Sequence, residues 1–128
     1  MGSEVVTVLV ADDSEAFRAG MVRAVQAHAE LSLISEVDGG AAALAAITEM
    51  QPDVALLDVR MPGLDGLEVC ERVREVEPPM RTRVVLLSAH LDDVVVARAN
   101  EVGADAYMSK ALSRREICSE AVRVARSA

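Results

Sequence analysis

Apolar and polar residues follow one another along the chain in blocks that predict five strands. Five apolar runs have the length of a strand, and they span residues 5–11, 31–37, 54–57, 84–87 and 106–108. The first, third and fourth runs are nearly continuous in aliphatic residues, which is typical of strands covered by helices on both faces. These runs lack alternation of apolar and polar positions, so a sheet with one face in water is disfavoured.

Helical patterns fill the intervals between these runs. Residues 17–25 carry apolar side chains at the spacing of one buried stripe. Further helices are predicted over 41–50, over about 67–76 and over about 94–102, and a last one starts at Ser113, where Ser113 and Glu116 match a capping box. Strands alternating with helices predict βαβ units and a parallel sheet between two helical layers. The fold class is therefore α/β, a single doubly wound domain over residues 1–128.

Composition and charge narrow the function classes. The 128 residues include 13 Lys and Arg against 21 Asp and Glu, for a formal net charge of −8. A protein that binds DNA by general phosphate attraction needs a basic surface, so any DNA-binding part is expected outside this chain. Cys70 and Cys118 are not spaced as a metal site and are predicted to be reduced thiols. The sequence has no membrane-length apolar run and no signal pattern, which predicts a cytoplasmic protein without a membrane partner.

Polar residues directly follow four of the predicted strands. They are Asp12-Asp13, Asp58, Ser88 and Ser109-Lys110. Ligands of parallel α/β sheets bind beyond the carboxyl ends of the strands, so these side chains are expected to meet at one edge. Singly, most have an ordinary explanation: Asp12 and Asp13 could cap a helix, Ser88 could be a turn hydroxyl, and Lys110 could be a solvated surface lysine. Their combination favours a functional site.

Asp58 is unusual even alone, because it ends a buried strand, where a carboxylate needs a partner. Bringing Asp12, Asp13 and Asp58 together costs about 4 kcal/mol per close pair at an effective dielectric constant of about 20 unless cations compensate. Lys110 and a divalent metal are the two candidates. Carboxylates that form an incomplete cage suit Mg²⁺, which completes its shell with water and phosphate oxygens. The pattern therefore predicts a Mg²⁺ site that receives a phosphoryl group.

In order and spacing, these residues resemble the receiver domain of bacterial two-component response regulators. The matching segments are Asp12-Asp13, the run Asp-Val-Arg-Met-Pro-Gly-Leu-Asp-Gly over 58–66, Ser88-Ala89 and Lys110. The resemblance covers essentially the whole chain. It implies a flavodoxin-like, five-stranded parallel sheet of order 2-1-3-4-5.

The resemblance also implies a role for each acidic residue. Asp58 would accept a phosphoryl group from a sensor histidine kinase. The side chains of Asp13 and Asp58 and the backbone carbonyl of Arg60 would hold Mg²⁺, and Asp12 would act mainly through a bound water. Such a domain is a phosphoacceptor rather than an enzyme, since it catalyses only its own phosphotransfer and dephosphorylation.

Three further residues would read out the phosphoryl group. Lys110 would pair with a phosphoryl oxygen, and the Ser88 hydroxyl would hydrogen-bond to the same group. In the family this hydroxyl moves inward on phosphorylation, and an aromatic residue at the position of Tyr107 follows it from exposed to buried. The ordinary interpretation of Tyr107 is a half-buried strand aromatic. The helix over 94–102 fits a mobile element, because its three consecutive valines have low helix propensity.

Some positions depart from the common family pattern. Ser88 stands where Thr is common and keeps the hydroxyl. Ala111 follows Lys110 where many members have Pro, so a cis peptide bond is not implied there. Arg60 and His90 occupy positions that influence the lifetime of the acyl phosphate in this family.

The segments 110–117 and 62–66 look most like the NarL/FixJ subfamily, whose members carry a helix-turn-helix domain after the receiver. Control of transcription through an effector domain absent from this chain is therefore expected. The alternatives are a stand-alone regulator acting on a protein partner and a receiver that works without phosphorylation. The first or the last helix could also form the interface of a homodimer. A solvated helix face explains the arginines of the last helix equally well. A dehalogenase-like phosphatase or a nucleotide-binding domain is disfavoured, because their D-x-D or glycine-rich motifs do not follow the first strand.

Overall fold

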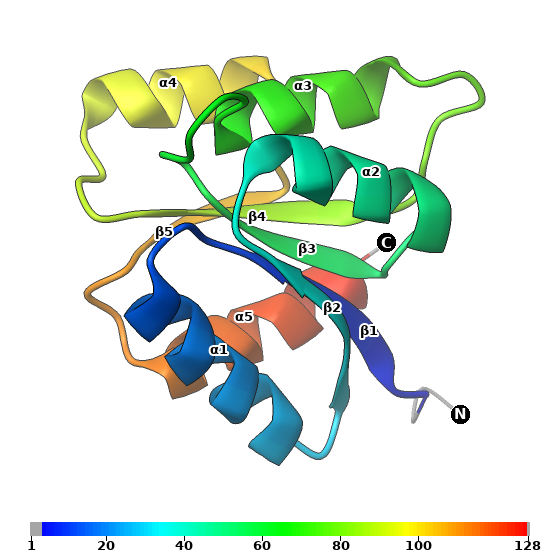
Figure 1. The fold of residues 1–128 in the computed structure, drawn as a ribbon, viewed down its shortest axis with the longest axis vertical. Coiled ribbons are helices and arrows are strands. Elements are labelled where there is room, and N and C mark those ends of the chain that lie inside the picture. The colour runs from blue at the N-terminus through cyan, green and yellow to red at the C-terminus, as the bar shows by residue number, and fades with distance from the viewer. Residues whose placement is uncertain (1–3, 128) are drawn as a thin grey trace.

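In the computed structural model, residues 4–127 are described and form one parallel sheet between two layers of helices (Figure 1). The strands are β1 (Val6–Ala11), β2 (Leu31–Val37), β3 (Val54–Asp58), β4 (Arg83–Ser88) and β5 (Ala106–Ser109). All neighbours pair in parallel, in the order β2-β1-β3-β4-β5. The predicted α/β class and the flavodoxin-like strand order are both confirmed.

The helices alternate with the strands and lie on both faces of the sheet. They are α1 (Glu15–Ala27), α2 (Gly40–Met50), α3 (Gly66–Glu75), α4 (Asp93–Glu101) and α5 (Arg114–Ala125). Figure 1 shows α1 and α5 on one face and α2, α3 and α4 on the other. The right-handed crossovers of βαβ units produce this division into two layers. No helix of the described residues is long and apolar enough to cross a membrane.

Short polar side chains set the starts of several helices. Ser14 caps α1 by accepting a hydrogen bond from the backbone N–H of Phe17. The predicted capping box of Ser113 and Glu116 is present at α5, with both reciprocal hydrogen bonds formed. Each such cap satisfies backbone donors that a helix leaves free at its start. The beginnings of these helices are therefore fixed by local sequence.

The aliphatic strands separate two cores. Leu9, Leu57 and Leu86 face the layer of α2, α3 and α4, whereas the neighbouring residues Leu56 and Leu87 face α1 and α5. All five side chains are at most 2% exposed. Burial on both faces explains why these strands show no alternation of apolar and polar residues.

The two cysteines belong to these cores and are free thiols. Cys70 lies in the core under α3, and Cys118 lies in the core under α5. The Cys70 thiol donates a weak hydrogen bond to the carbonyl of Val102, just after α4. Burial raises the pKa of Cys70 to about 11 and also raises the pKa of Cys118. Their predicted place in the core is confirmed.

Gly40, at the start of α2, lies directly against the loop before α3. A Cβ at this position would lie 1.9 Å from the carbonyl oxygen of Leu64, a backbone atom that cannot rotate away. We expect Gly40→Ala to lower the free energy of unfolding by about 2 to 3 kcal/mol. Gly39→Ala is the matched control, because a Cβ there meets nothing within 4 Å, and it should cost at most about 1 kcal/mol. Urea unfolding of both variants measures this difference, and equal losses would contradict the close approach at Gly40.

Candidate functional site

The carboxyl ends of four strands bring the sequence-predicted residues to one edge of the sheet. Asp12 follows β1, Asp58 ends β3, Ser88 ends β4 and Lys110 follows β5. The parallel register aligns these ends, since Ala11 pairs with Leu57 and Asp58 pairs with Leu87. The expected common edge is therefore present.

Three carboxylates gather at this edge. Asp12, Asp13 and Asp58 each offer an oxygen within 4.8 Å of the others. Asp12 and Asp58 are buried, at 1% and 5% exposure, whereas Asp13 is exposed. Backbone amides hold one oxygen of each buried acid: Asp12 Oδ1 accepts from Ser14 at 2.8 Å, and Asp58 Oδ1 accepts from Arg60 at 3.3 Å.

Lys110 joins the two buried carboxylates. Its Nζ lies 2.7 Å from Oδ2 of Asp12 and 3.2 Å from Oδ1 of Asp58. The first contact is an ion pair outside hydrogen-bonding geometry, so the buried Asp12 Oδ2 makes no hydrogen bond. One ammonium therefore serves two acids, and the pocket keeps an excess of negative charge.

This excess affects the titration of Asp58. Burial is the largest cause that raises the pKa of Asp58, the nearby Asp12 carboxylate adds to the rise, and Lys110 opposes both. Together these effects raise the pKa of Asp58 from 3.8 to about 7. Bringing a carboxylate out of water beside a like charge favours its neutral form. Metal-free Asp58 therefore gains a proton far more readily than an ordinary aspartate.

The residues of this pocket fit a hard divalent cation. All three side chains present oxygen atoms, the donors that Mg²⁺ prefers. The buried Asp12 Oδ2 pairs with Lys110 but accepts no hydrogen bond, which a metal-bound water would supply. A set of three carboxylates leaves positions for water and for phosphate oxygens. The geometry thus suits the predicted metal, while the part played by the Arg60 carbonyl stays a prediction.

Ser88 and Tyr107, the two residues predicted to switch, lie on β4 and β5 near this edge. The Ser88 hydroxyl donates to the carbonyl of His90 at 2.8 Å and accepts from the His90 N–H at 3.1 Å. Tyr107, on β5, is half-buried and packs against the core under α2, α3 and α4. Its environment matches the ordinary interpretation of a half-buried strand aromatic, and its movement stays a prediction.

Serine side chains and backbone groups shape the loop that carries Lys110. The Lys110 N–H donates to the carbonyl of Ser88, and the Ala111 N–H donates to the hydroxyl of Ser109 at 3.0 Å. The Lys110–Ala111 peptide bond is trans. The loop thus reaches the site without the proline that is common in the family.

Sequence reasoning missed two residues of α1 that touch the site. Arg18 donates to the backbone carbonyl of Asp12 at 2.8 Å and forms an ion pair with Glu36 on β2. The Phe17 ring lies under the ammonium of Lys110. The sequence placed Phe17 only on the buried stripe of a helix. Its position within the first turn after the acidic pair was the available signal.

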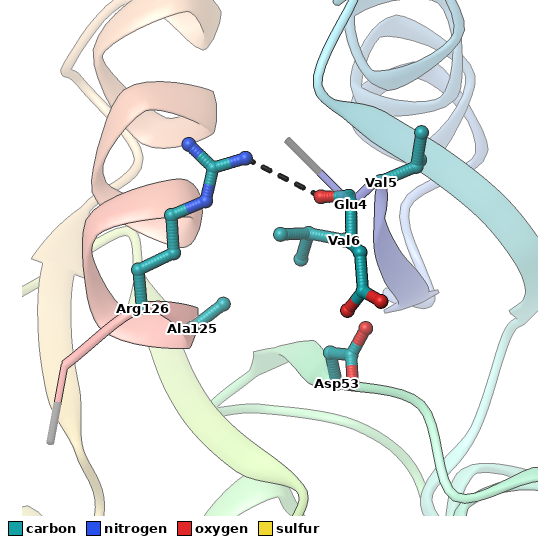
Figure 2. A pocket seen from close by; sticks show the side chains of 6 residues that line it. All are labelled: Glu4, Val5, Val6, Asp53, Ala125 and Arg126. Carbon is teal, nitrogen blue, oxygen red and sulfur yellow. Dashed lines mark hydrogen bonds between the residues drawn. The ribbon is translucent and has the colours of Figure 1, made fainter. Parts of the chain in front are cut away.

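A hollow of about 190 Å³ lies at the opposite edge of the sheet, beside the amino ends of β1 and β3 and the end of α5 (Figure 2). Arg126 donates there to the carbonyl of Glu4 at 3.3 Å and also pairs with Glu30. Arg123 likewise pairs with Glu120 on the same helix. These ion pairs offset part of the positive charge that the sequence places on α5.

A doubly wound sheet with a lysine-bridged acidic pocket at its carboxyl edge defines an α/β domain of the receiver class. Residues 8–122 match the sequence model described as the response regulator receiver domain. The chain belongs to this family.

Two curated relatives that are similar to this chain in sequence are named as transcriptional regulatory proteins. The chain is 46% identical over 114 residues to the probable transcriptional regulatory protein NarL of Mycobacterium tuberculosis, which covers 89% of this chain and 52% of the relative. It is 32% identical over 121 residues to the transcriptional regulatory protein LiaR of Bacillus subtilis. This match covers 94% of this chain and 56% of LiaR. The chain thus spans about half the length of these relatives.

Solved structures agree with this assignment. The receiver domain of the putative response regulator NarL from M. tuberculosis superposes with a TM-score of 0.93 at 42% identity, covering 98% of this chain and 99% of that one. A DNA-binding response regulator of the LuxR family from Staphylococcus aureus superposes with a TM-score of 0.89 at 26% identity. This match covers 95% of this chain and 100% of that one. The predicted likeness to the NarL/FixJ group is confirmed by these NarL and LuxR-family neighbours.

Proposed function

We propose that this chain accepts a phosphoryl group on Asp58 from a sensor histidine kinase. Mg²⁺ would be held by the side chains of Asp13 and Asp58 and the backbone carbonyl of Arg60, with Asp12 acting mainly through a bound water. The observation that carries the proposal is the pair of buried carboxylates, Asp12 and Asp58, bridged by the single ammonium of Lys110. Such a pocket is costly to maintain unless it receives further positive charge and a ligand. Response regulators of this kind are phosphorylated by histidine kinases.

In the proposed step, a carboxylate oxygen of Asp58 forms a bond to phosphorus as the phosphorus–nitrogen bond to the kinase histidine breaks. The imidazole leaves with the electron pair and then takes a proton from water. Bound Mg²⁺ supplies positive charge against the carboxylates and the phosphoryl oxygens. Because the transferring phosphoryl group is only loosely bonded, positioning and charge neutralisation supply most of the catalysis. Lys110, already beside Asp58, neutralises charge on a phosphoryl oxygen.

The same group is proposed to drive the conformational switch. A phosphoryl group on Asp58 adds up to two negative charges and new acceptor oxygens. The Ser88 hydroxyl would leave the His90 carbonyl to donate to it, which frees the loop before α4. Tyr107 would follow towards the core. α4 suits such a change, since Val94 is 72% exposed and the helix buries only Val95 and Ala99.

The output is proposed to be transcriptional, through a DNA-binding domain outside this chain. Two observations support this: the chain has a net charge of −8, and its curated relatives are transcriptional regulators about twice its length. The receiver is part of a signalling protein rather than a conventional enzyme, so its chemistry is limited to its own phosphorylation and dephosphorylation. A cytoplasmic location and a homodimer stay predictions.

The test is to incubate the protein with Mg²⁺ and acetyl phosphate and to measure its intact mass. We expect the gain of one phosphoryl group, and a chelator should abolish it because the acidic pocket then lacks its second cation. Failure to gain mass would contradict the proposal, and a lack of Mg²⁺ binding in addition would favour a module that works without phosphorylation.

A further inference from the structure

Two cations from another part of the chain lie over the ring of Phe17. Nζ of Lys110 is 4.5 Å from the ring centroid, and Cζ of Arg114 is 5.1 Å from it. Both distances fall within the roughly 6 Å over which the face of an aromatic ring attracts a cation. Phe17 lies in the first turn of α1, whereas Arg114 is the first residue of α5. The ring therefore joins α1 to the loop that carries Lys110.

Gly20 completes the surface on which these cations lie. It is three residues after Phe17 and so lies on the same face of α1. A Cβ at Gly20 would lie 2.4 Å from Nε of Arg114, so the missing side chain leaves room for the guanidinium. Phe17 and Gly20 thus accommodate Lys110 and Arg114 side by side, which is specific packing rather than a chance contact of one flexible chain.

The ammonium of Lys110 needs such a restraint. Its backbone is fixed by the hydrogen bond to Ser88, but the ammonium sits at the end of a flexible four-carbon stem. Asp12 and Asp58 both attract it, at 2.7 Å and 3.2 Å. The ring face of Phe17 adds a third attraction from α1, which limits how far the ammonium can follow either carboxylate alone.

We propose that Phe17 is a positioning residue for phosphoryl transfer: its ring holds the Lys110 ammonium between Asp12 and Asp58, where phosphoryl oxygens arrive. The inference rests on the proposed function and assigns a role in it to a residue outside the acidic cluster. Phe17 acts through Lys110. Its replacement should therefore slow phosphorylation and leave the carboxylates free to bind Mg²⁺.

The first experiment compares rates of phosphorylation by acetyl phosphate in Phe17→Leu, Phe17→Tyr and the wild-type protein. Leu keeps an apolar side chain but removes the ring, so the rate should fall roughly 3- to 30-fold while the affinity for Mg²⁺ is unchanged. Tyr keeps the ring face and should stay within about twofold of wild type. Met21→Leu is the matched control, because Met21 is buried on α1 in the core and its exchange should not alter the rate.

A double-mutant cycle separates positioning from general loosening of α1. In a Lys110→Gln background, Phe17→Leu should cause no further loss of rate, because the cation that it positions is gone. A second measurement does not depend on phosphorylation. In NMR spectra, the methylene protons next to Lys110 Nζ should show an upfield ring-current shift in the wild-type protein that disappears in Phe17→Leu.

Equal rates for Phe17→Leu and the wild type would overturn the inference, as would an undiminished effect in the Lys110→Gln background or a missing ring-current shift. The proposed function can fail separately. If the wild-type protein gains no phosphoryl group, the function fails and the role of Phe17 with it. If both proteins are phosphorylated at the same rate, only the role of Phe17 fails.

Discussion

Asp58→Asn should abolish the Mg²⁺-dependent gain of a phosphoryl group from acetyl phosphate. The amide keeps the size of the carboxylate but lacks the anionic oxygen that forms the bond to phosphorus. Asp58 ends β3 inside the pocket, and Lys110 lies 3.2 Å from its Oδ1. Intact-mass measurement after incubation is the readout, and we expect complete loss rather than a slower reaction.

Asp92→Asn is the matched control for this exchange. Asp92 is an exposed aspartate that caps α4 by accepting from the N–H of Val95, and asparagine caps a helix about equally well. It should gain the phosphoryl group as the wild type does. Mg²⁺-dependent labelling that persists in Asp58→Asn would show that another residue is the nucleophile.

Asp58→Asn should also stabilise the metal-free protein at neutral and alkaline pH. Burial and the neighbouring Asp12 raise the pKa of Asp58 from 3.8 to about 7. The folded protein therefore keeps this proton up to about pH 7, while the unfolded chain loses it near pH 4. Folding stability linked to Asp58 falls as the pH rises through this window, because the folded state binds more protons than the unfolded state.

The difference between the pKa values of Asp58 in the folded and unfolded states corresponds to at most about 4 kcal/mol of folding free energy. Asn carries no charge, so Asp58→Asn should raise the free energy of unfolding by about 2 kcal/mol or more at about pH 8, and by little at about pH 4. Urea unfolding in a chelator at both pH values measures this. Mg²⁺ should narrow the gap, because the wild type keeps all three carboxylates and is stabilised by the metal more than the variant.

Asp92→Asn again serves as the control and should show no such dependence on pH, since Asp92 is exposed at a helix start. If Asp58→Asn instead destabilises the metal-free protein at about pH 8, the ion pair with Lys110 outweighs the cost of burying the carboxylate. The description of the pocket as overloaded with negative charge would then be wrong.

The fold could be predicted because its signals are local. The continuous aliphatic runs of β1, β3 and β4 indicate strands covered on both faces, and the structure buries them in two cores. Element bounds differ from the prediction by one or two residues: α3 starts at Gly66 rather than Leu67, and α1 extends two residues beyond each end of the predicted stripe 17–25. The order of the strands is a different matter: periodicity does not determine it, and it followed from the resemblance to receivers.

The site was predictable to the same extent. The rule that parallel strands present their carboxyl ends at one edge is enough to bring Asp12, Asp58 and Lys110 together. It does not determine which side chains of the neighbouring helices reach that edge. The contacts of Phe17 and Arg18 depend on the rotation and tilt of α1 against the sheet, which are tertiary properties. The hydrogen bond of Ser88 to His90 depends on a loop conformation in the same way.

The buried thiols have a practical consequence for spectroscopy. A thiol reacts as its thiolate, and Cys70 and Cys118 are both inaccessible and hard to ionise. A single cysteine introduced at an exposed position such as Val94 on α4 would therefore take up a maleimide fluorophore or spin label selectively. Both native cysteines could stay in place, and the proposed movement of α4 could be tested in a chain altered at one surface position.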